Sequence, residues 1–416
     1  MSRQKGAVLL FSFLCVLPAW GRAEENVQEQ ILAVFHPYRQ GALQVDGITP
    51  GMTIDKTNAQ VAATVLPPDI LKYITAGHFA IPVQPTTDLP LRPAHINATL
   101  EHYGKASLGE DTLQHYVAGR PFPLIAPQDP QAGLKVAWNL RYRDQGENAQ
   151  MWSTNELRNS SGNVERAQSF YFVSLYGMHR PEADKNLPQW ERRGFYSKQY
   201  SRMLAPADME GTQTLSVTHD NNALGDDQWM YDTRTRRIRK TVYNPYDAPG
   251  GGELLVEDRA GFIGHIPHYE WQYLGEQVVL APGPIKAATP TWGGRGNWYP
   301  IDPWELRRAH VIEARPKIAH PTYSRRVLYI DLQTSVVLYS LVYDHQGNHH
   351  RTFLLVYRHP EFNPWENEVW LPQTAAQPSI DYQRDRATIF QIHKIFHNRP
   401  MNETRFTTMG LMLYGK

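Results

Sequence analysis

From about residue 119 onwards, apolar and polar residues alternate in short runs. A period of two is typical of strands that bury one face and expose the other. The run LKVAWNLRY at residues 134–142 has this pattern and predicts a strand. The nearly all-apolar residues 336–343 predict a strand that is covered on both faces. Further alternating runs predict strands at residues 170–173, 269–274, 327–330 and 352–357.

Turn residues separate these runs, and few long helical patterns lie between them. This arrangement favours a large antiparallel sheet over a fold of alternating strands and helices. The fold class expected from the pattern is therefore mainly β (α+β), with one large antiparallel sheet spanning residues 119–416.

Residues 24–118 lack the alternation. Helical patterns predict short helices at residues 27–34, 53–65 and 69–76. Four prolines between residues 82 and 93 then predict extended, irregular chain, because proline fixes φ and lacks an amide donor. We expect a helical and loop-rich N-terminal segment that precedes the β domain.

Residues 1–23 have the pattern of a secretory signal peptide. Arg3 and Lys5 precede a short apolar run, and Ala23 supplies the small residue that a signal peptidase requires. The run is shorter than the roughly 20 residues of a membrane span. Cys15 follows Leu14 inside the apolar run, which is not the pattern of a lipoprotein signal. We expect a soluble periplasmic protein that is neither lipidated nor transmembrane.

Composition excludes several classes of function. Cys15 is the only cysteine and lies in the signal, so a disulfide framework, a thiolate metal site and a cysteine nucleophile are excluded from the mature chain. The chain has 42 Lys and Arg and 41 Asp and Glu. The signal removes three of the basic residues and no acid, which leaves a net charge of −2. That balance does not indicate a nucleic-acid-binding protein.

An Asp-x-x-Thr turn occurs twice between predicted strands, at Asp232 and at Asp331. Asp accepts hydrogen bonds from the backbone amides that follow it, so both stretches predict tight hairpins. The first turn leads into three arginines at positions 236, 237 and 239. Two interpretations remain for Arg236, Arg237 and Arg239: a solvated face that guards a sheet edge, or contacts to a partner protein or an anionic headgroup.

Several motifs resemble the signatures of a proteobacterial periplasmic family of unknown function. The first is Ala118-Gly119-Arg120-Pro121-Phe122-Pro123, followed by Asp129-Pro130 and Lys135-x-x-Trp138-Asn139. The second is Trp229-x-Tyr231 with Arg236-Arg237-Ile238-Arg239, and the third is Glu257-Asp258-x-x-Gly261-Phe262-x-Gly264. The strand pair from Asp331 to Asp344 resembles one that is common in the LolA and LolB lipoprotein carriers.

This resemblance implies a strongly curved antiparallel sheet, a half-open barrel, whose concave side is closed by helices. In that superfamily the enclosed space is an apolar cavity for acyl chains or other lipid-like ligands. Relatives are often encoded beside inner-membrane exporters of the resistance–nodulation–division class and outer-membrane proteins. The family brings no catalytic residues with it.

Aromatic residues are abundant, with 11 Trp, 22 Tyr and 14 Phe. Two interpretations fit them: an ordinary core beneath covering helices, or the wall of a ligand cavity. The cavity candidates are Trp138, Tyr142, Phe170, Phe172, Trp229, Tyr231, Trp271, Tyr273, Trp292 and Trp298. The last two lie in a Gly- and Pro-rich loop at residues 282–303, which together with the glycines around residue 250 is a candidate lid.

Catalytic and metal-binding patterns are weak. The chain has no Gly-x-Ser-x-Gly elbow and no phosphate-binding loop, and its histidine clusters do not have zinc spacing. We therefore expect no catalytic residues, metal or cofactor. The favoured function is a periplasmic carrier for a lipid or other hydrophobic molecule. The alternatives are an adaptor subunit of an envelope export complex, without ligand, and an enzyme that acts on a lipid or glycan.

Overall fold

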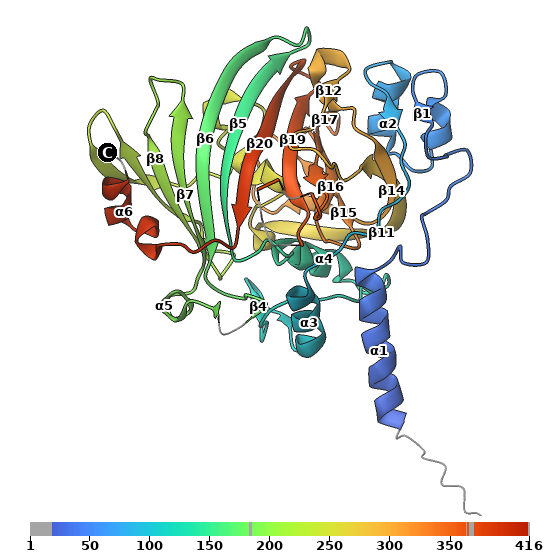
Figure 1. Ribbon diagram of the computed structural model, residues 1–416, viewed down its shortest axis with the longest axis horizontal. Coiled ribbons are helices and arrows are strands. Elements are labelled where there is room, and N and C mark those ends of the chain that lie inside the picture. Colours follow the sequence, from blue (N-terminus) through green and yellow to red (C-terminus); the bar gives the residue numbers. More distant parts are fainter. Residues whose placement is uncertain (1–18, 183–184, 363, 366–369, 415–416) are drawn as a thin grey trace, which may run out of the picture.

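A 14-stranded antiparallel sheet dominates the computed structural model, which describes residues 19–182, 185–362, 364–365 and 370–414 (Figure 1). The strand order is β10-β9-β8-β7-β6-β5-β20-β19-β17-β16-β15-β14-β11, and β18 pairs with β19. The first strands in the chain are β5 (Asn148–Asn159), β6 (Val164–Tyr176), β7 (Phe195–Ala205), β8 (Gln213–His219), β9 (Asp227–Asp232) and β10 (Arg237–Val242). The others are β11 (Tyr269–Pro282), β14 (Trp304–Pro316), β15 (Arg325–Asp331), β16 (Val337–Tyr343), β17 (His349–Leu354), β18 (Val356–Arg358), β19 (Gln373–Asp381) and β20 (Arg386–His397). The predicted fold class is confirmed.

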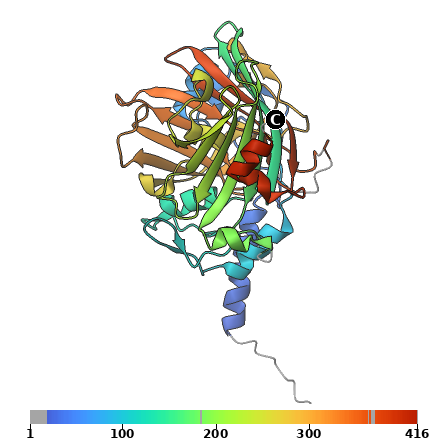
Figure 2. The same ribbon diagram turned by 90° about the vertical axis from the view of Figure 1, so that its left-hand side faces the viewer.

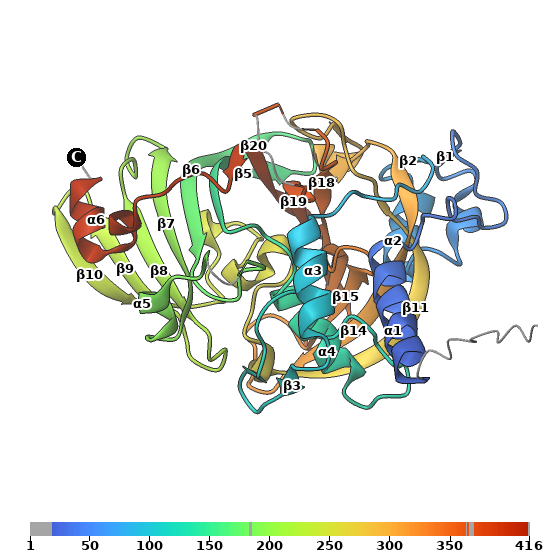
Figure 3. The same cartoon turned by 60° about the horizontal axis from the view of Figure 1, so that its bottom comes forward.

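The two edge strands, β10 and β11, follow one another in the chain but lie at opposite ends of the sheet. Figure 3 shows the sheet as an arc, with the connecting residues 243–268 inside it. This crossing segment contains only short 3₁₀ turns: η3 (Pro249–Gly251), η4 (Val256–Gly261) and η5 (Ile266–His268). The sheet is therefore a half-open barrel, and the chain that joins its edges lies across its concave side.

Helix α4 (Ala132–Arg141) also lies on the concave side, against β11 and β14. The strand predicted for residues 134–142 is therefore wrong. A Cβ on Gly133 would lie 2.8 Å from the backbone of Gln272, so the helix approaches β11 very closely. Most residues of this helix are themselves buried. A helix that is buried on most sides has no distinct apolar stripe of period 3.6. The apolar positions that were assigned to one strand face also fit such a helix.

The outer face of β14 to β20 is covered by N-terminal chain. Ile54, Ile70 and Ile74 form one hydrophobic core with side chains of that half of the sheet. The covering elements are β1 (Thr53–Ile54), η1 (Ala59–Ala62), α2 (Pro68–Thr75) and β2 (Ile81–Pro82). The helix predicted for residues 53–65 is wrong, because Asp55 accepts the Thr57 amide and Asn58 donates to the Thr53 carbonyl, and these bonds form a turn.

The outer face of the other half is covered by the C-terminus. Helix α6 (Thr408–Leu413) lies across β8 to β10, next to η7 (Glu403–Phe406) and α5 (Pro188–Glu191) (Figure 2). Remaining elements are α1 (Ala19–Phe35), α3 (Pro93–His102), β3 (Ser107–Leu108), β4 (Leu113–Gln114), β12 (Trp292–Gly293), η6 (Arg295–Asn297) and β13 (Tyr299–Pro300). Residues 1–18 of the predicted signal peptide lie outside the described residues. Among the described helices, none has the length and apolarity needed to cross a membrane.

Both predicted hairpins are confirmed. The Asp232 carboxylate accepts hydrogen bonds from the amides of Arg234 and Thr235 between β9 and β10. The Asp331 carboxylate accepts the Thr334 amide, at 2.9 Å, between β15 and β16. Strand β16 is buried along its whole length, as its apolar sequence predicts.

Candidate ligand cavity

A cavity of about 560 Å³ lies on the concave face of β6 to β9, beneath the crossing segment. Its volume is within the roughly 300–1,000 Å³ that is usual for small-molecule sites. On the other half of the concave face, α4 and residues 254–266 pack in one hydrophobic core with β14 to β17.

Cross-strand pairing arranges the floor of the cavity in two rows. In one row, Ser174 of β6 pairs with Gln199 of β7, which pairs with Ser216 of β8 and then Gln228 of β9. The neighbouring row consists of Phe172, Ser201, Thr214 and Met230. All eight side chains belong to residues that line the cavity.

The floor is therefore mixed rather than wholly apolar. Residues that alternate with it, such as Leu215 and Tyr200, are buried in the outer core that includes Leu411 of the C-terminal helix. Phe170, Met203 and Met209 add apolar surface beside the rows. A floor with apolar side chains at one end and hydroxyl and amide groups at the other suits a molecule with both apolar and polar parts.

Three buried acids attach the roof of the cavity to the sheet. Glu253 accepts a hydrogen bond from Arg351 at 2.8 Å. Asp258 accepts one from Arg326 at 2.5 Å and another from Tyr323 at 2.9 Å. The roof segment from Glu253 to Asp258 is thus fixed to β15 and β17 by charge-assisted hydrogen bonds.

Glu257 is the third acid, and it receives hydrogen bonds from Tyr269, His320 and Arg326. Burial alone would raise the pKa of Glu257, but the His320 hydrogen bond and the Arg326 charge outweigh burial and lower it. Burial alone would likewise lower the pKa of Arg326, but the carboxylates of Asp258 and Glu257 raise it. These buried groups remain charged at neutral pH, and each has a partner.

The glycines of the third family signature permit this attachment. Gly261 has φ +83°, and a Cβ there would lie 2.5 Å from the Val337 side chain of β16. Its carbonyl accepts a hydrogen bond from Arg326 at 3.0 Å. The turn therefore needs a residue that tolerates left-handed backbone and close contact with the sheet.

Arg259 lies between the anchoring acids and this glycine, and it lines the cavity. Its guanidinium carbon is 5.5 Å from the centroid of the Phe172 ring on the floor. Within the part of the chain that the structure describes, it forms neither a salt bridge nor a hydrogen bond. Burial lowers the pKa of Arg259, and among the described residues Tyr243 alone opposes that shift. The cavity roof therefore presents a cation that has no counter-ion among the described residues.

Asp226 lines the same cavity and accepts a hydrogen bond from Thr218 at 2.8 Å through one oxygen. Its other oxygen is buried and, among the described residues, has no hydrogen-bond partner. Burial raises the pKa of Asp226 to about 6. The folded protein therefore favours the protonated form of this carboxyl more than the unfolded chain does.

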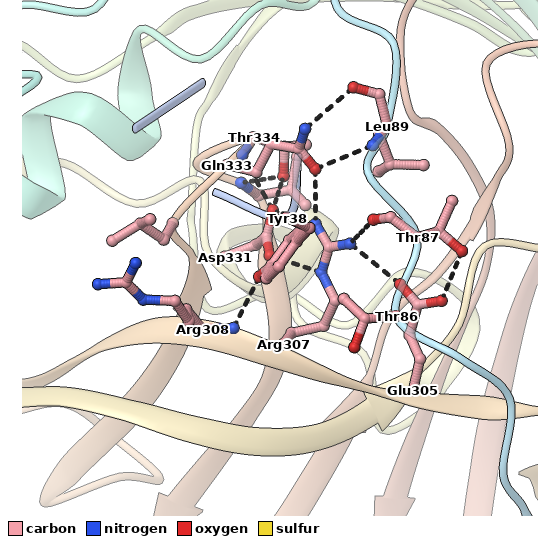
Figure 4. Close-up of polar contacts among 12 residues, drawn as sticks. Tyr38, Thr86, Thr87, Leu89, Glu305, Arg307, Arg308, Asp331, Gln333 and Thr334 are labelled. Carbon is pink, nitrogen blue, oxygen red and sulfur yellow. Dashed lines mark hydrogen bonds and ion pairs between the residues drawn. The ribbon is translucent and has the colours of Figure 1, made fainter. Parts of the chain in front are cut away.

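A second polar cluster lies outside the cavity, around Arg307 (Figure 4). The guanidinium donates to Asp331 at 2.9 Å, to Glu305 at 3.0 Å and to the Thr87 carbonyl at 2.7 Å. The Tyr38 ring lies 4.6 Å from the guanidinium carbon. Arg307 is thus saturated by protein groups, and this cluster attaches N-terminal chain to the sheet instead of offering a binding site.

The structure places the predicted aromatic residues in several environments. Phe170 and Phe172 line the cavity. Trp138 and Tyr142 belong to the core around α4, and Trp271 and Tyr273 of β11 pack against that core. Trp229 and Tyr231 of β9 face the C-terminal helix on the outer side.

The aromatics of the 282–303 loop lie far from the cavity floor in the sheet order. Trp298 is fully buried in the core beneath the N-terminal chain. Trp292 packs against that core, and its indole donates to Gln391 at 2.8 Å. A role of these two residues in binding stays a prediction.

The arginines of the first hairpin are exposed. Arg236 occupies the turn with φ +54°, and Arg237 and Arg239 belong to the edge strand β10. Arg239 pairs with Met230 of the cavity floor, so it lies one strand beyond the lining. Both interpretations of these arginines, solvated face or contact surface, stay open.

Sequence reasoning missed Arg259 and the hydroxyl rows. Arg259 occupies a variable position inside a signature whose fixed residues are structural. The run QTLSVTH at residues 213–219 does alternate polar with apolar residues, but this pattern is typical of a strand with one face in solvent. Only the path of the crossing segment shows that the polar face is roofed.

Histidines from the weak metal candidates have other partners. His350 bonds to Asp381 at 3.0 Å, and His345 lies 2.9 Å from the His320 carbonyl oxygen. His265 lies 2.7 Å from the Asn222 carbonyl oxygen, and burial lowers the pKa of His265 to about 4. Among the described residues there is no cluster of three or more side chains suited to hold a metal ion.

A curved antiparallel sheet, crossed on its concave side and hollow on one half, defines a half-open β barrel with an internal cavity. A family model described as "protein of unknown function (DUF1329)" matches residues 53–411. The chain belongs to this family, and the expected membership of a family of unknown function is confirmed.

Similar proteins are known from several bacteria. An uncharacterized protein of Pseudomonas aeruginosa is 26% identical over 273 residues, which are 62% of this chain and 57% of that protein. The matched part is thus little more than half of the relative's length.

Solved structures of similar shape include a putative outer membrane lipoprotein-sorting protein domain from Vibrio parahaemolyticus, at 17% identity and a TM-score of 0.48. A DUF1329 family protein from Desulfovibrio piger has 16% identity and the same TM-score of 0.48. Each match covers 68% of this chain and all of the other. A LolA superfamily protein from Nitrosomonas europaea has 11% identity and a TM-score of 0.40, over 68% of this chain and 98% of that one.

Proposed function

We propose that this protein binds a lipid or another amphipathic molecule non-covalently in the cavity and carries it through the periplasm. The observation that supports this most directly is the roofed cavity of about 560 Å³ with its mixed floor. Burial of each methylene group contributes roughly 0.8 kcal/mol, so the apolar end alone would hold a short chain firmly. The signal-like residues 1–23 support the periplasmic location. Transfer to or from an envelope transporter is part of the same proposal.

The cavity favours this proposal over an adaptor without ligand, for which a solid core would be expected. An enzyme would need acids and histidines that converge on a substrate. The cavity's His265 is instead bound to the Asn222 backbone, and Asp226 to Thr218. These groups serve local structure, which supports binding over catalysis.

Native mass spectrometry with solvent extraction tests the proposal, on protein purified from a bacterial periplasm. We expect a co-purifying lipid or hydrophobic metabolite at near one-to-one stoichiometry. Thr214→Trp should abolish it, because the indole would fill the centre of the floor. Thr235→Trp, in the exposed turn before β10, is the matched control and should retain the ligand.

A protein that has no bound molecule, and whose mass stays unchanged after incubation with phospholipid and fatty-acid mixtures, would contradict the carrier. Equal ligand occupancy in both tryptophan variants would contradict the site.

A further inference from the structure

The cavity contains more positive charge than its own acids neutralise. Arg141, Arg143 and Arg259 all line it, and none forms a salt bridge with a described residue. Arg141 donates to the His219 carbonyl at 3.0 Å, and Arg143 to the Leu140 carbonyl at 2.7 Å. These two are thus partly satisfied by backbone, whereas Arg259 is not.

The acids of the cavity lining form no salt bridge with Arg259 among the described residues. Asp226 and Asp247 are the carboxylates of the lining. Asp247 accepts a hydrogen bond from Asn244, and Asp226 accepts one from Thr218. Tyr243 also lines the cavity, and the charges of both Asp226 and Arg259 act on its pKa, which burial raises.

The local fold fixes Arg259 in the lining of the cavity. Glu257 and Asp258, just before it, are buried against Arg326 of the sheet. Ala260, just after it, has φ +50°. Gly261 lies so close to Val337 that a Cβ on the glycine would be 2.5 Å from that side chain. The turn thus directs two consecutive acids toward the sheet and the next residue, a cation, toward the cavity. Arg259 is half-buried, and a guanidinium in a partly enclosed cavity gains more from an anionic partner than it would in bulk water.

We propose that the ligand carries an oxyanion headgroup, carboxylate or phosphate, that binds Arg259, while its apolar chain lies along Phe172, Phe170 and Met203. This inference rests on the proposed function and names the class of its ligand: an anionic amphiphile. The planar guanidinium has five donors and matches an oxyanion in two-pronged geometry. Among the described residues no protein group competes for those donors.

Isothermal titration with matched ligands below their micelle concentrations tests this inference. The ligands are dodecyl phosphate, dodecanoate and dodecanol, which share one chain, together with inorganic phosphate, which has none. The full chain after signal removal is stripped of bound lipid and compared with Arg259→Gln, Arg259→Lys and Arg192→Gln. Arg192 is an exposed arginine just after α5 and outside the cavity lining, so it serves as the control.

We expect the wild-type protein to bind dodecyl phosphate and dodecanoate about ten- to a hundredfold more tightly than dodecanol, as a hydrogen-bonded charge pair provides. Arg259→Gln should lose this preference and keep its affinity for dodecanol. Arg259→Lys should keep part of the preference, since the charge remains, and Arg192→Gln should match the wild-type protein. Thermal melts of each variant establish that the fold is retained.

Equal affinities of the wild-type protein for dodecyl phosphate, dodecanoate and dodecanol would overturn the inference but would not contradict the carrier function. The inference would also be overturned if the affinity of Arg259→Gln for dodecanol fell by the same factor as its affinity for dodecyl phosphate. If inorganic phosphate bound as tightly as dodecyl phosphate, the site would be one for free anions, and the inference of an amphipathic ligand would be overturned. If none of the three twelve-carbon ligands bound to the wild-type protein, the proposed function itself would be contradicted.

Discussion

Glu257 accepts hydrogen bonds from Tyr269, His320 and Arg326, whereas Asp226 accepts one, from Thr218, and has a second oxygen without a described partner. The pKa values of these two acids move in opposite directions for this reason. The His320 hydrogen bond and the charge of Arg326 hold the pKa of Glu257 down, while burial raises that of Asp226. At the scale of single residues, Arg259 lines the cavity without an ion-pair partner among the described residues, whereas the buried charges of the anchor are paired.

Asp226→Asn should stabilise the protein in a pH-dependent way. The folded state raises the pKa of Asp226 from 3.8 to about 6, so it favours the protonated acid. The stability that depends on this proton is fully present below about pH 4 and is lost as pH rises through 6. At pH 8 the variant should gain about 1–3 kcal/mol, since one pKa unit corresponds to roughly 1.4 kcal/mol.

Urea denaturation of both proteins at pH 4 and at pH 8 measures this effect. The difference between variant and wild type should be near zero at pH 4 and positive at pH 8. The same difference at both pH values would mean that Asp226 is not held in its protonated form.

At the scale of elements, periodicity predicted the strands well and failed where tertiary contacts overrode it. Strand β16 is apolar throughout and buried on both faces, and the two Asp-x-x-Thr turns have the hydrogen bonds that their sequence predicts. Residues 134–142 are helical because Gly133 lets them pack against β11, and no local pattern contains that contact. The position of Arg259 depends in the same way on the path of residues 243–268, which joins the two edges of the sheet.

Gly261→Ala should loosen the roof segment. The new Cβ would lie 2.5 Å from Val337 at φ +83°, so overpacking adds to backbone strain. Together these should cost about 2–4 kcal/mol of unfolding free energy. Gly347→Ala is a matched control, because Gly347 also has φ +83° but a Cβ there would meet nothing within 4 Å.

Denaturant titration of the two alanine variants separates the contributions. Gly347→Ala should lose only the backbone part, about 1–2 kcal/mol. Equal losses would show that Val337 moves aside, and that the roof is not tightly packed against β16.

At the scale of the whole molecule, the two halves of the sheet are covered differently. On the half from β14 to β20, both faces are covered, by N-terminal chain outside and by α4 with the roof segment inside. On the half from β6 to β9, the C-terminal helix covers the outer face and the inner face is hollow. A closely packed half therefore supports the roof over a hollow half.

The Arg307 cluster gives a test of this division (Figure 4). Arg307→Met would leave Glu305 and Asp331, both almost wholly buried, without their cation. Loss of one partner from a buried ion pair costs about 3–5 kcal/mol. Arg308→Met, one residue further on, removes an exposed arginine paired with Glu276 and should cost about 1 kcal/mol or less.

Hydrogen exchange followed by mass spectrometry shows where this loss acts. The amides of residues 84–90, which contact Arg307 and Gln333, should exchange faster in Arg307→Met. The roof residues 253–262 should exchange as in the wild-type protein, because their anchors are Arg326 and Arg351. The affinity for dodecyl phosphate, the probe of the proposed site, should then be unchanged. If roof and N-terminal amides instead lose protection together, the two halves of the sheet unfold as one unit, and the supporting half cannot be separated from the cavity.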